Sequence, residues 1–343
     1  MPVDIEFGTL ISKKLWDDRE RKSISAVIAD TDRSLVGSGN DTIKYPIRKS
    51  PGAQILSATA AASPTDVAWE YVSITVDKRI HSSFQVPYIT QKLAAIKLIE
   101  KLLDVATLDM ARQLDLWVLQ VAAGYTEVSD EAVGTGDNST TEFALDHSPV
   151  LEVTSVELDG TPTTDYTVDY DDGKIKFSDP PATDVAITAS YAYADSDTHV
   201  MHTSSAGSLT VSDVFNASAT MKARGFTPNY LIIPPKARYL LENNLISKFQ
   251  FTQTTDKVPG LVGAIGDIKV IETDLLPDSY AVMLKAPPDN PAVVKVHASN
   301  VEVRKMDRPD YARTDVFLDE FVKPVRVLPD AVQVIIGFAS NAY

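Results

Sequence analysis

The segment from Val86 to Gly124 constrains the fold more than any other part of the sequence. Pro87 suits the first turn of a helix, Gly124 suits a left-handed stop, and no Pro or Gly lies between them. We therefore predict one helix over residues 86–124, about 50 Å long at about 1.5 Å per residue. Its apolar residues recur every three or four positions, the period of one helix face. That face contains Ile89, Leu93, Ile96, Ile99, Leu103, Ala106, Met110, Leu114, Trp117 and Val121.

A second apolar row on the same segment indicates that the helix is covered on more than one side. Such a helix is typical of the backbone of a flat or elongated molecule. The row contains Leu98, Leu102, Val105, Leu108, Leu116 and Leu119.

Composition excludes several classes of protein. The chain has no cysteine, which removes disulfides, thiolate catalysis and cysteine-based metal sites. No run of about 18 apolar residues occurs, so we expect no membrane-spanning segment. The net charge is −15, with 47 acidic and 32 basic residues.

This negative charge is concentrated in residues 126–200. The segment holds 17 Asp and Glu against two Lys, and the rest of the chain is neutral. Asp159-Gly160 and Asp172-Gly173 separate alternating runs, which is a strong hairpin signal. We predict an acidic β module that avoids nucleic acid. Its expected strands are Val150–Leu158, Asp165–Tyr170, Lys174–Phe177 and Val185–Tyr193.

Two unusual segments precede the helix. Residues 1–40 form an arm of mixed charge with few large apolar residues, which we expect to order against another surface; the alternative is a loosely packed terminus. Residues 41–85 predict a long hairpin with strands Thr42–Arg48 and Ala68–Ile80. A two-stranded ribbon of this length is marginally stable alone. A neighbouring copy is therefore its expected cover; the alternative is a flexible surface loop.

The chain after Ser208 changes to an α/β pattern. Helices are expected at 211–224 and 236–246, and Phe249–Gly266 is expected to be a loop. We place Pro324 at a sheet edge or bulge, because it has no N–H for a ladder. The expected strands are 229–235, 268–272, 280–285, 292–305, 314–327 and 331–339.

Motifs that carry chemistry are scarce. Asp195, Asp197, His199 and His202 are candidates for a divalent metal, with a hydrophilic linker as the alternative interpretation. No phosphate-binding loop or nucleophile elbow occurs. We therefore expect no enzymatic activity, no cofactor and no established metal site.

The order of these blocks resembles the major capsid proteins of tailed double-stranded DNA viruses, which have the Hong Kong 97-type fold. The resemblance covers roughly residues 1–125 and 205–343. It rests on the segments AWEYVSITVDKRIHSSFQVPYITQKL, LLDVATLDMARQLDLWVL, NYLIIPPKARYLLE and GLVGAIGDIKVIETDLLP.

The resemblance implies an α+β fold with an inserted all-β module. It assigns residues 1–40 to an N-arm, 41–85 to an extended loop, 86–125 to the spine helix of a peripheral domain completed by strands near 292–322, 126–200 to the inserted module, and 205–290 with 327–343 to an axial domain. The residues it implies at subunit interfaces are Trp16, Arg19, Arg21, Ile43, Tyr45, Lys49, Trp69, Tyr71, Phe249, Phe251 and Gly263.

The implied function is self-assembly of pentamers and hexamers into an icosahedral shell around double-stranded DNA, held without sequence-specific contacts. Scaffolding, portal and decoration proteins would be its partners, and the virion, assembled in the host cytoplasm, its location. We expect the acidic module to face outward, away from the DNA. Two alternatives stay open: an encapsulin-like nanocompartment shell, and a β-rich binding or adhesion protein.

Overall fold

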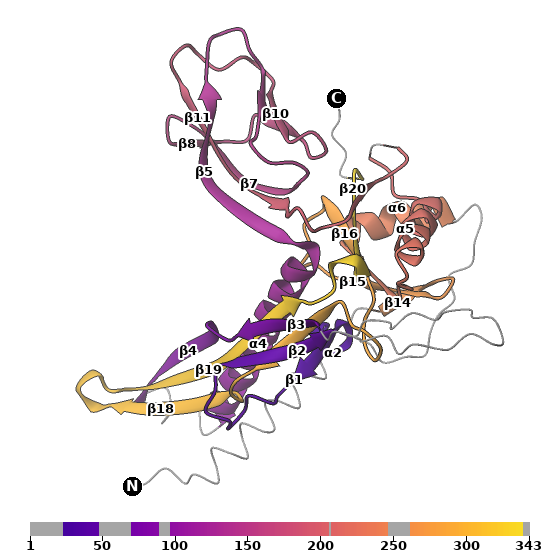
Figure 1. Ribbon diagram of the computed structural model, residues 1–343. Helices are drawn as coiled ribbons and strands as arrows, with labels where there is room; N and C mark the ends of the chain where they lie inside the picture. Colours follow the sequence, from indigo (N-terminus) through magenta and orange to yellow (C-terminus); the bar gives the residue numbers. More distant parts are fainter. Residues whose placement is uncertain (1–22, 48–69, 89–96, 206, 246–260, 339–343) are drawn as a thin grey trace, which may run out of the picture.

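The computed structural model of the chain describes residues 23–47, 70–88, 97–205, 207–245 and 261–338. Helix α4 (Lys97–Ala123) lies at the centre of these residues, and two sheets and a separate β module diverge from it (Figure 1). The module and the six-stranded part of the body lie at the C-terminal end of α4, and the five-stranded part of the body runs along the helix. None of the helices in these residues is long and apolar enough to cross a membrane.

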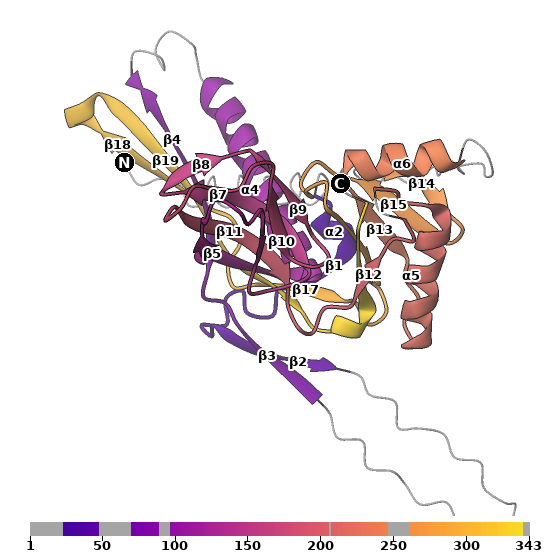
Figure 2. The same ribbon diagram turned by 90° about the horizontal axis from the view of Figure 1, so that it is seen from above.

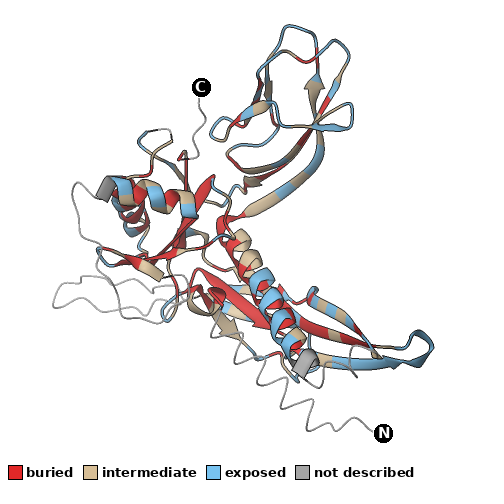
Figure 3. Cartoon of the chain, turned by 180° about the vertical axis from the view of Figure 1, so that it is seen from behind, coloured by how far each residue is buried: buried red, intermediate tan, exposed pale blue. Residues whose placement is uncertain are grey.

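Helix α4 follows the predicted apolar period over its described length. Leu103, Met110 and Leu114 are buried at the expected spacing, and Figure 3 shows buried and exposed residues alternating along the helix. Gly124 ends the helix with φ +64°, and a Cβ there would lie 1.9 Å from the Thr198 hydroxyl. The positive φ and the lack of space both therefore exclude a side chain at position 124.

Two expectations about this segment are wrong. Pro87 does not begin the helix, because it is the last residue of strand β4 (Arg79–Pro87). The second apolar row is only partly covered: Leu119 is buried, whereas Val105 is 54% exposed and Leu108 is 42% exposed. One side of α4 therefore presents apolar surface within a single copy.

A five-stranded sheet packs against α4. Its long strand β19 (Arg313–Arg326) pairs with β17 (Val293–His297), with β18 (Glu302–Arg308) and with β4, and β1 (Ala29–Asp32) pairs with β17. The predicted strand 292–305 is therefore two strands.

The pairing of β19 confirms the expected place of Pro324. Strand β4 pairs with residues 313–321 of β19, and Pro324 lies beyond them, opposite Lys295 of β17. In this stretch β19 has a ladder partner on one side only, which suits a residue without an N–H.

The described part of the predicted hairpin is built from β2 (Thr42–Ile47) and β3 (Glu70–Thr75), and its tip lies outside the described residues. The expected return strand to Ile80 is wrong, because the chain leaves the ribbon after Thr75 and enters β4 of the other sheet. A single alternating pattern therefore concealed a change of sheet. Figure 2 shows the ribbon projecting from the side of the five-stranded sheet opposite α4.

The acidic module contains two small sheets around its own core, formed by residues such as Val156, Ile175 and Tyr191. Both Asp-Gly turns occur where predicted, between β7 and β8 and between β9 and β10. The sheets contain β5 (Tyr125–Thr135), β11 (Ala186–Ala194), β7 (Val150–Leu158) and β8 (Thr161–Thr163), and β6 (Glu142–Ala144), β10 (Lys174–Phe177) and β9 (Tyr166–Asp169).

A six-stranded sheet forms the remaining part of the body. Helices α5 (Val211–Ala223) and α6 (Pro235–Leu245) share a core with one face of this sheet, and the other face joins the core around α4. Its order is β12 (Val200–His202), β20 (Val332–Ile336), β16 (Tyr280–Leu284), β13 (Tyr230–Ile233), β15 (Ile268–Glu272) and β14 (Leu261–Ile265).

Two edge strands of this sheet were expected to be loops. Strand β14 occupies the end of the predicted loop Phe249–Gly266, and β12 lies in the predicted linker after the module. Both are short, and pairing with β15 and β20 rather than local propensity makes them strands.

The burial of α4 gives a direct stability test. Leu114 has no exposed surface, so Leu114→Ala should lower the free energy of unfolding of the dissociated chain by about 2–5 kcal/mol. Val105→Ala removes apolar atoms from an exposed position of the same helix and should cost less than about 1 kcal/mol. Urea denaturation measures both variants, and equal losses would contradict the burial described for α4.

Candidate subunit interface

The four metal candidates of the sequence do not form one site. Asp195 pairs with Arg326, His199 Nε2 lies 2.7 Å from Asp330, and His202 Nδ1 lies 2.9 Å from Asp171. The backbone N–H of Asp197 donates to the Asp195 carboxylate at 3.1 Å. Among the described residues, no three potential metal ligands gather in one place. These side chains instead connect separate parts of the chain.

The pair of Arg326 and Asp195 joins the module to the body. The Arg326 guanidinium donates to both Asp195 oxygens, at 2.7 and 2.8 Å, and to the Thr198 hydroxyl at 2.6 Å. The Asp195 N–H donates to the carbonyl of Gly124 at 2.9 Å. The end of α4, the exit of the module and strand β19 therefore meet at one ion pair, whose Arg326 side chain is only 9% exposed.

Four of the predicted interface residues lie in the described part of the chain. Ile43 and Tyr45 face the body of their own copy, where they pack on a cluster that includes Val294. Tyr71 is on the other side of the ribbon and is 53% exposed. Gly263 is buried in β14 instead of lying in a loop. Seven others lie outside the described residues: Trp16, Arg19, Arg21, Lys49, Trp69, Phe249 and Phe251.

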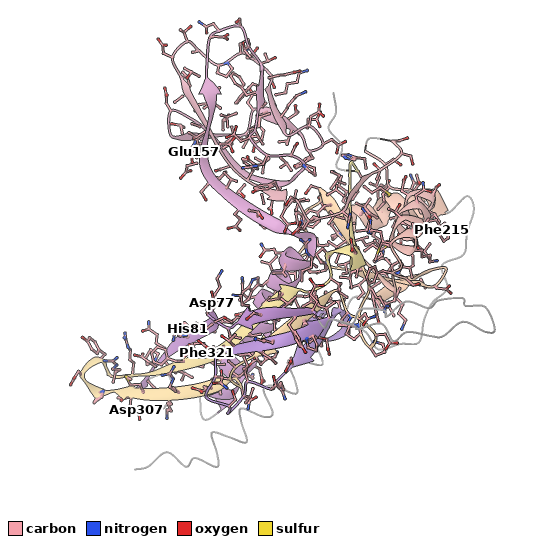
Figure 4. All side chains as sticks on the ribbon, viewed as in Figure 1. Asp77, His81, Glu157, Phe215, Asp307 and Phe321 are labelled. Carbon is pink, nitrogen blue, oxygen red and sulfur yellow. The ribbon has the colours of Figure 1, made fainter. Side chains whose placement is uncertain are left out.

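A surface that the sequence did not reveal lies on the five-stranded sheet, on the side away from α4. Strands β4, β19 and β18 bring together side chains that are far apart in the sequence, and Figure 4 labels two of them, His81 and Phe321. We call this surface the arginine face. Its residues are Arg79, His81, Glu302, Arg304, Met306, Arg308, Arg313, Asp315, Phe317, Asp319 and Phe321.

Asp319 organises the centre of the arginine face. Its carboxylate accepts from Arg304 at 2.5 Å, lies 2.7 Å from His81 Nδ1 and lies 3.5 Å from Arg79. The Asp319 side chain is 3% exposed, whereas those of Arg79 and Arg304 are 53% and 62% exposed. The anion is thus buried beneath cations that face the solvent.

The same arrangement recurs nearer the end of the β18–β19 hairpin. Arg308 and Arg313 lie 3.6 and 2.9 Å from the Asp315 carboxylate, whose side chain is 11% exposed. The arginine face also exposes large apolar side chains: Met306 is 47% exposed and Phe321 is 40% exposed. Arginine, methionine and aromatic residues are enriched at protein–protein interfaces, so this surface has the composition of one.

Burial of Asp319 opposes its ionisation, but hydrogen bonds from His81 and Arg304 and the charge of Arg79 outweigh burial. The pKa of Asp319 is therefore below its ordinary value. Because the pKa is depressed in the folded state, ionised Asp319 stabilises the fold above its unfolded-state pKa, near about 4. That contribution is lost as pH falls through the folded-state pKa.

Asp319→Asn should therefore be less stable than the wild type at pH 7 and should lose less stability between pH 5 and pH 3. Urea midpoints at a series of pH values measure this difference. Asp179→Asn, at an exposed position of the module, is the control and should follow the wild type. If the urea midpoints of the wild type and of Asp319→Asn fall equally between pH 5 and pH 3, the role assigned to Asp319 is contradicted.

Comparison of the sequence with known proteins gives one partial match to a family. A family described as "Protein of unknown function UCP028589" matches residues 94–212. No curated protein matches the chain.

Solved structures match nearly the whole chain. The capsid of Ralstonia phage GP4 has a TM-score of 0.57 at 11% identity, and the capsid of Cyanophage P-SCSP1u has 0.54 at 10%. The SrpI encapsulin complex of Synechococcus elongatus PCC 7942 has 0.53 at 9%. Each match covers 92% of this chain and 88% of the other. The chain has an α+β fold of the Hong Kong 97 type.

Proposed function

We propose that this protein is a structural subunit that assembles with copies of itself into a closed shell. The observation that carries the proposal is the agreement of the fold with phage capsid and encapsulin structures over about nine-tenths of the chain. Closed symmetric assembly is also the usual way for identical chains to cover one another's exposed surface.

The uncovered parts of the chain support the same function. The β2–β3 ribbon projects from the body, and a ribbon of two strands is marginally stable when nothing covers it. Tyr71 on the ribbon, Val105 and Leu108 on α4 and the arginine face all present large side chains to solvent. Contacts between copies would cover these surfaces, as in obligate interfaces of more than about 2,000 Å².

The more specific proposal is a major capsid protein of a tailed double-stranded DNA virus. In this proposal the N-arm, extended loop, peripheral domain, inserted module and axial domain have the boundaries given above. The acidic module faces outward, since its charge of −15 would be repelled by packaged DNA. Scaffolding, portal and decoration proteins are the proposed partners, the virion is the proposed location, and no enzymatic step is assigned to the chain.

An encapsulin-like compartment is the second candidate, and the match to the SrpI encapsulin complex favours it. The two candidates share a shell and differ in what it encloses. A compartment would hold protein cargo, whereas a capsid would hold a genome. The third candidate, a β-rich binding protein that uses the module, requires no shell.

Light scattering and negative-stain microscopy of the purified protein test the shell directly. We expect uniform closed particles of megadalton mass. A monomer or small oligomer at every protein and salt concentration tested would contradict the shell and favour a binding protein.

Particles isolated from the native source then separate the first two candidates. Treatment with nuclease before disruption should leave protected double-stranded DNA if the protein is a capsid subunit. Particles that contain protein cargo and no protected DNA would identify a compartment instead.

A further inference from the structure

The arginine face presents positive charge because two of its three acids, Asp315 and Asp319, are buried, and only Glu302, opposite Asp319 on β18, is exposed. Arg79, Arg304 and Arg308 have side chains that are 53%, 62% and 47% exposed. The carboxylates beneath them, Asp315 and Asp319, are 11% and 3% exposed. An approaching partner therefore meets guanidinium groups, which buried acids already hold in place. Such preorganisation reduces the entropy lost on binding.

The arginine face also has a depression that a partner could enter. It measures about 640 Å³, and its lining combines cations with apolar side chains. The lining residues are Arg79, His81, Val303, Arg304, Lys305, Met306, Phe317 and Asp319. Guanidinium groups beside aromatic rings favour a partner that offers carboxylates.

The inserted module of the same protein has this chemistry. Residues 126–200 carry 17 acidic residues and two lysines. Asp165, Asp179 and Asp184 are exposed, and none of them has an ion pair with a cation among the described residues. None of the large apolar side chains that are exposed in the described chain lies in the module. Its contacts must therefore be mainly polar and charged.

Within one copy the two surfaces are apart. The module leaves from the C-terminal end of α4, and the β18–β19 hairpin diverges from it, so that their tips lie far apart (Figures 1 and 3). The Arg326 and Asp195 pair holds the base of the module to the body. A contact between the module and the arginine face must therefore join two copies through different surfaces, the type of contact that closes rings.

We propose that the arginine face binds the acidic module of a second copy of this chain. The inference rests on the proposed shell function and adds the pair of surfaces that meet. Buried Asp315 and Asp319 act as positioning residues for the guanidinium groups. The exposed carboxylates of the neighbouring module complete the charge balance.

Cross-linking of particles assembled from a mixture of ¹⁵N-labelled and unlabelled chains tests the contact. Met306 is exposed on the arginine face, so a photoreactive benzoylphenylalanine placed at position 306 should be found by mass spectrometry linked to residues 126–200. Linked peptides of mixed label would prove that two copies are involved. Particles in which position 306 is linked only outside residues 126–200, or not at all, would overturn the contact and leave the shell function intact.

Charge-neutral variants test the energetics in the same particles. Arg304→Gln keeps a donor for Asp319, and the triple variant D165N/D179N/D184N neutralises exposed acids of the module. Each should lower the NaCl concentration that dissociates half of the particles by about twofold, because charged contacts are screened by salt. Particles of the combined variant should dissociate at a NaCl concentration no lower than that of the less salt-resistant of the two variants.

Lys222→Gln is the matched control, since it removes one exposed cation from α5, and it should behave as the wild type. Additive effects in the combined variant, or wild-type salt resistance in both, would overturn the proposal. Loss of bound DNA from Arg304→Gln particles with unchanged salt resistance would identify nucleic acid as the occupant instead. Absence of any wild-type particle would count against the shell function itself.

Discussion

Burial of α4 is the interaction on which the rest of the structure depends. One hydrophobic cluster contains Leu114 and Val118 of the helix, Leu318 of the five-stranded sheet and Val282 of the six-stranded sheet. Residues from the base of the module, including Leu151, belong to the same cluster. The five-stranded sheet, the six-stranded sheet and the module are therefore all positioned by packing on one helix. Loss of the packing on α4 would therefore detach all three parts from one another, whereas damage to the core of one outer part would disrupt that part alone.

Polar contacts then decide how the parts are oriented on α4. Asp115 of the helix is buried and accepts from the backbone N–H groups of Ile24 and Ser25, which seats the first described residues of the chain. Arg326 of β19 binds Asp195 and Thr198 at the exit of the module, beside the C-terminal end of α4. Buried polar pairs of this kind add little net stability but permit few alternative geometries. A rigid orientation is what a subunit needs if its outer surfaces are to meet those of neighbouring copies.

The sequence was informative where one period persisted and uninformative where contacts decided. The helix face, the two Asp-Gly hairpins and the apolar strand Val332–Ile336 were predictable because local pattern and final structure agree. Strand β5 was missed because Asp130, with φ +52°, and register shifts interrupt its alternation. The arginine face could not be predicted, since pairing with β19 brings Arg79 and Arg304 together from opposite ends of the chain.

Hydrogen–deuterium exchange, compared between assembled particles and dissociated subunits, tests most directly the claim that the surfaces left open by one copy are covered by others. The account predicts slower exchange on assembly in the β2–β3 ribbon and the β18–β19 hairpin. The buried part of α4 should exchange slowly in both states, because its cover is within the chain. Equal exchange of the ribbon and the hairpin in the two states would contradict the account.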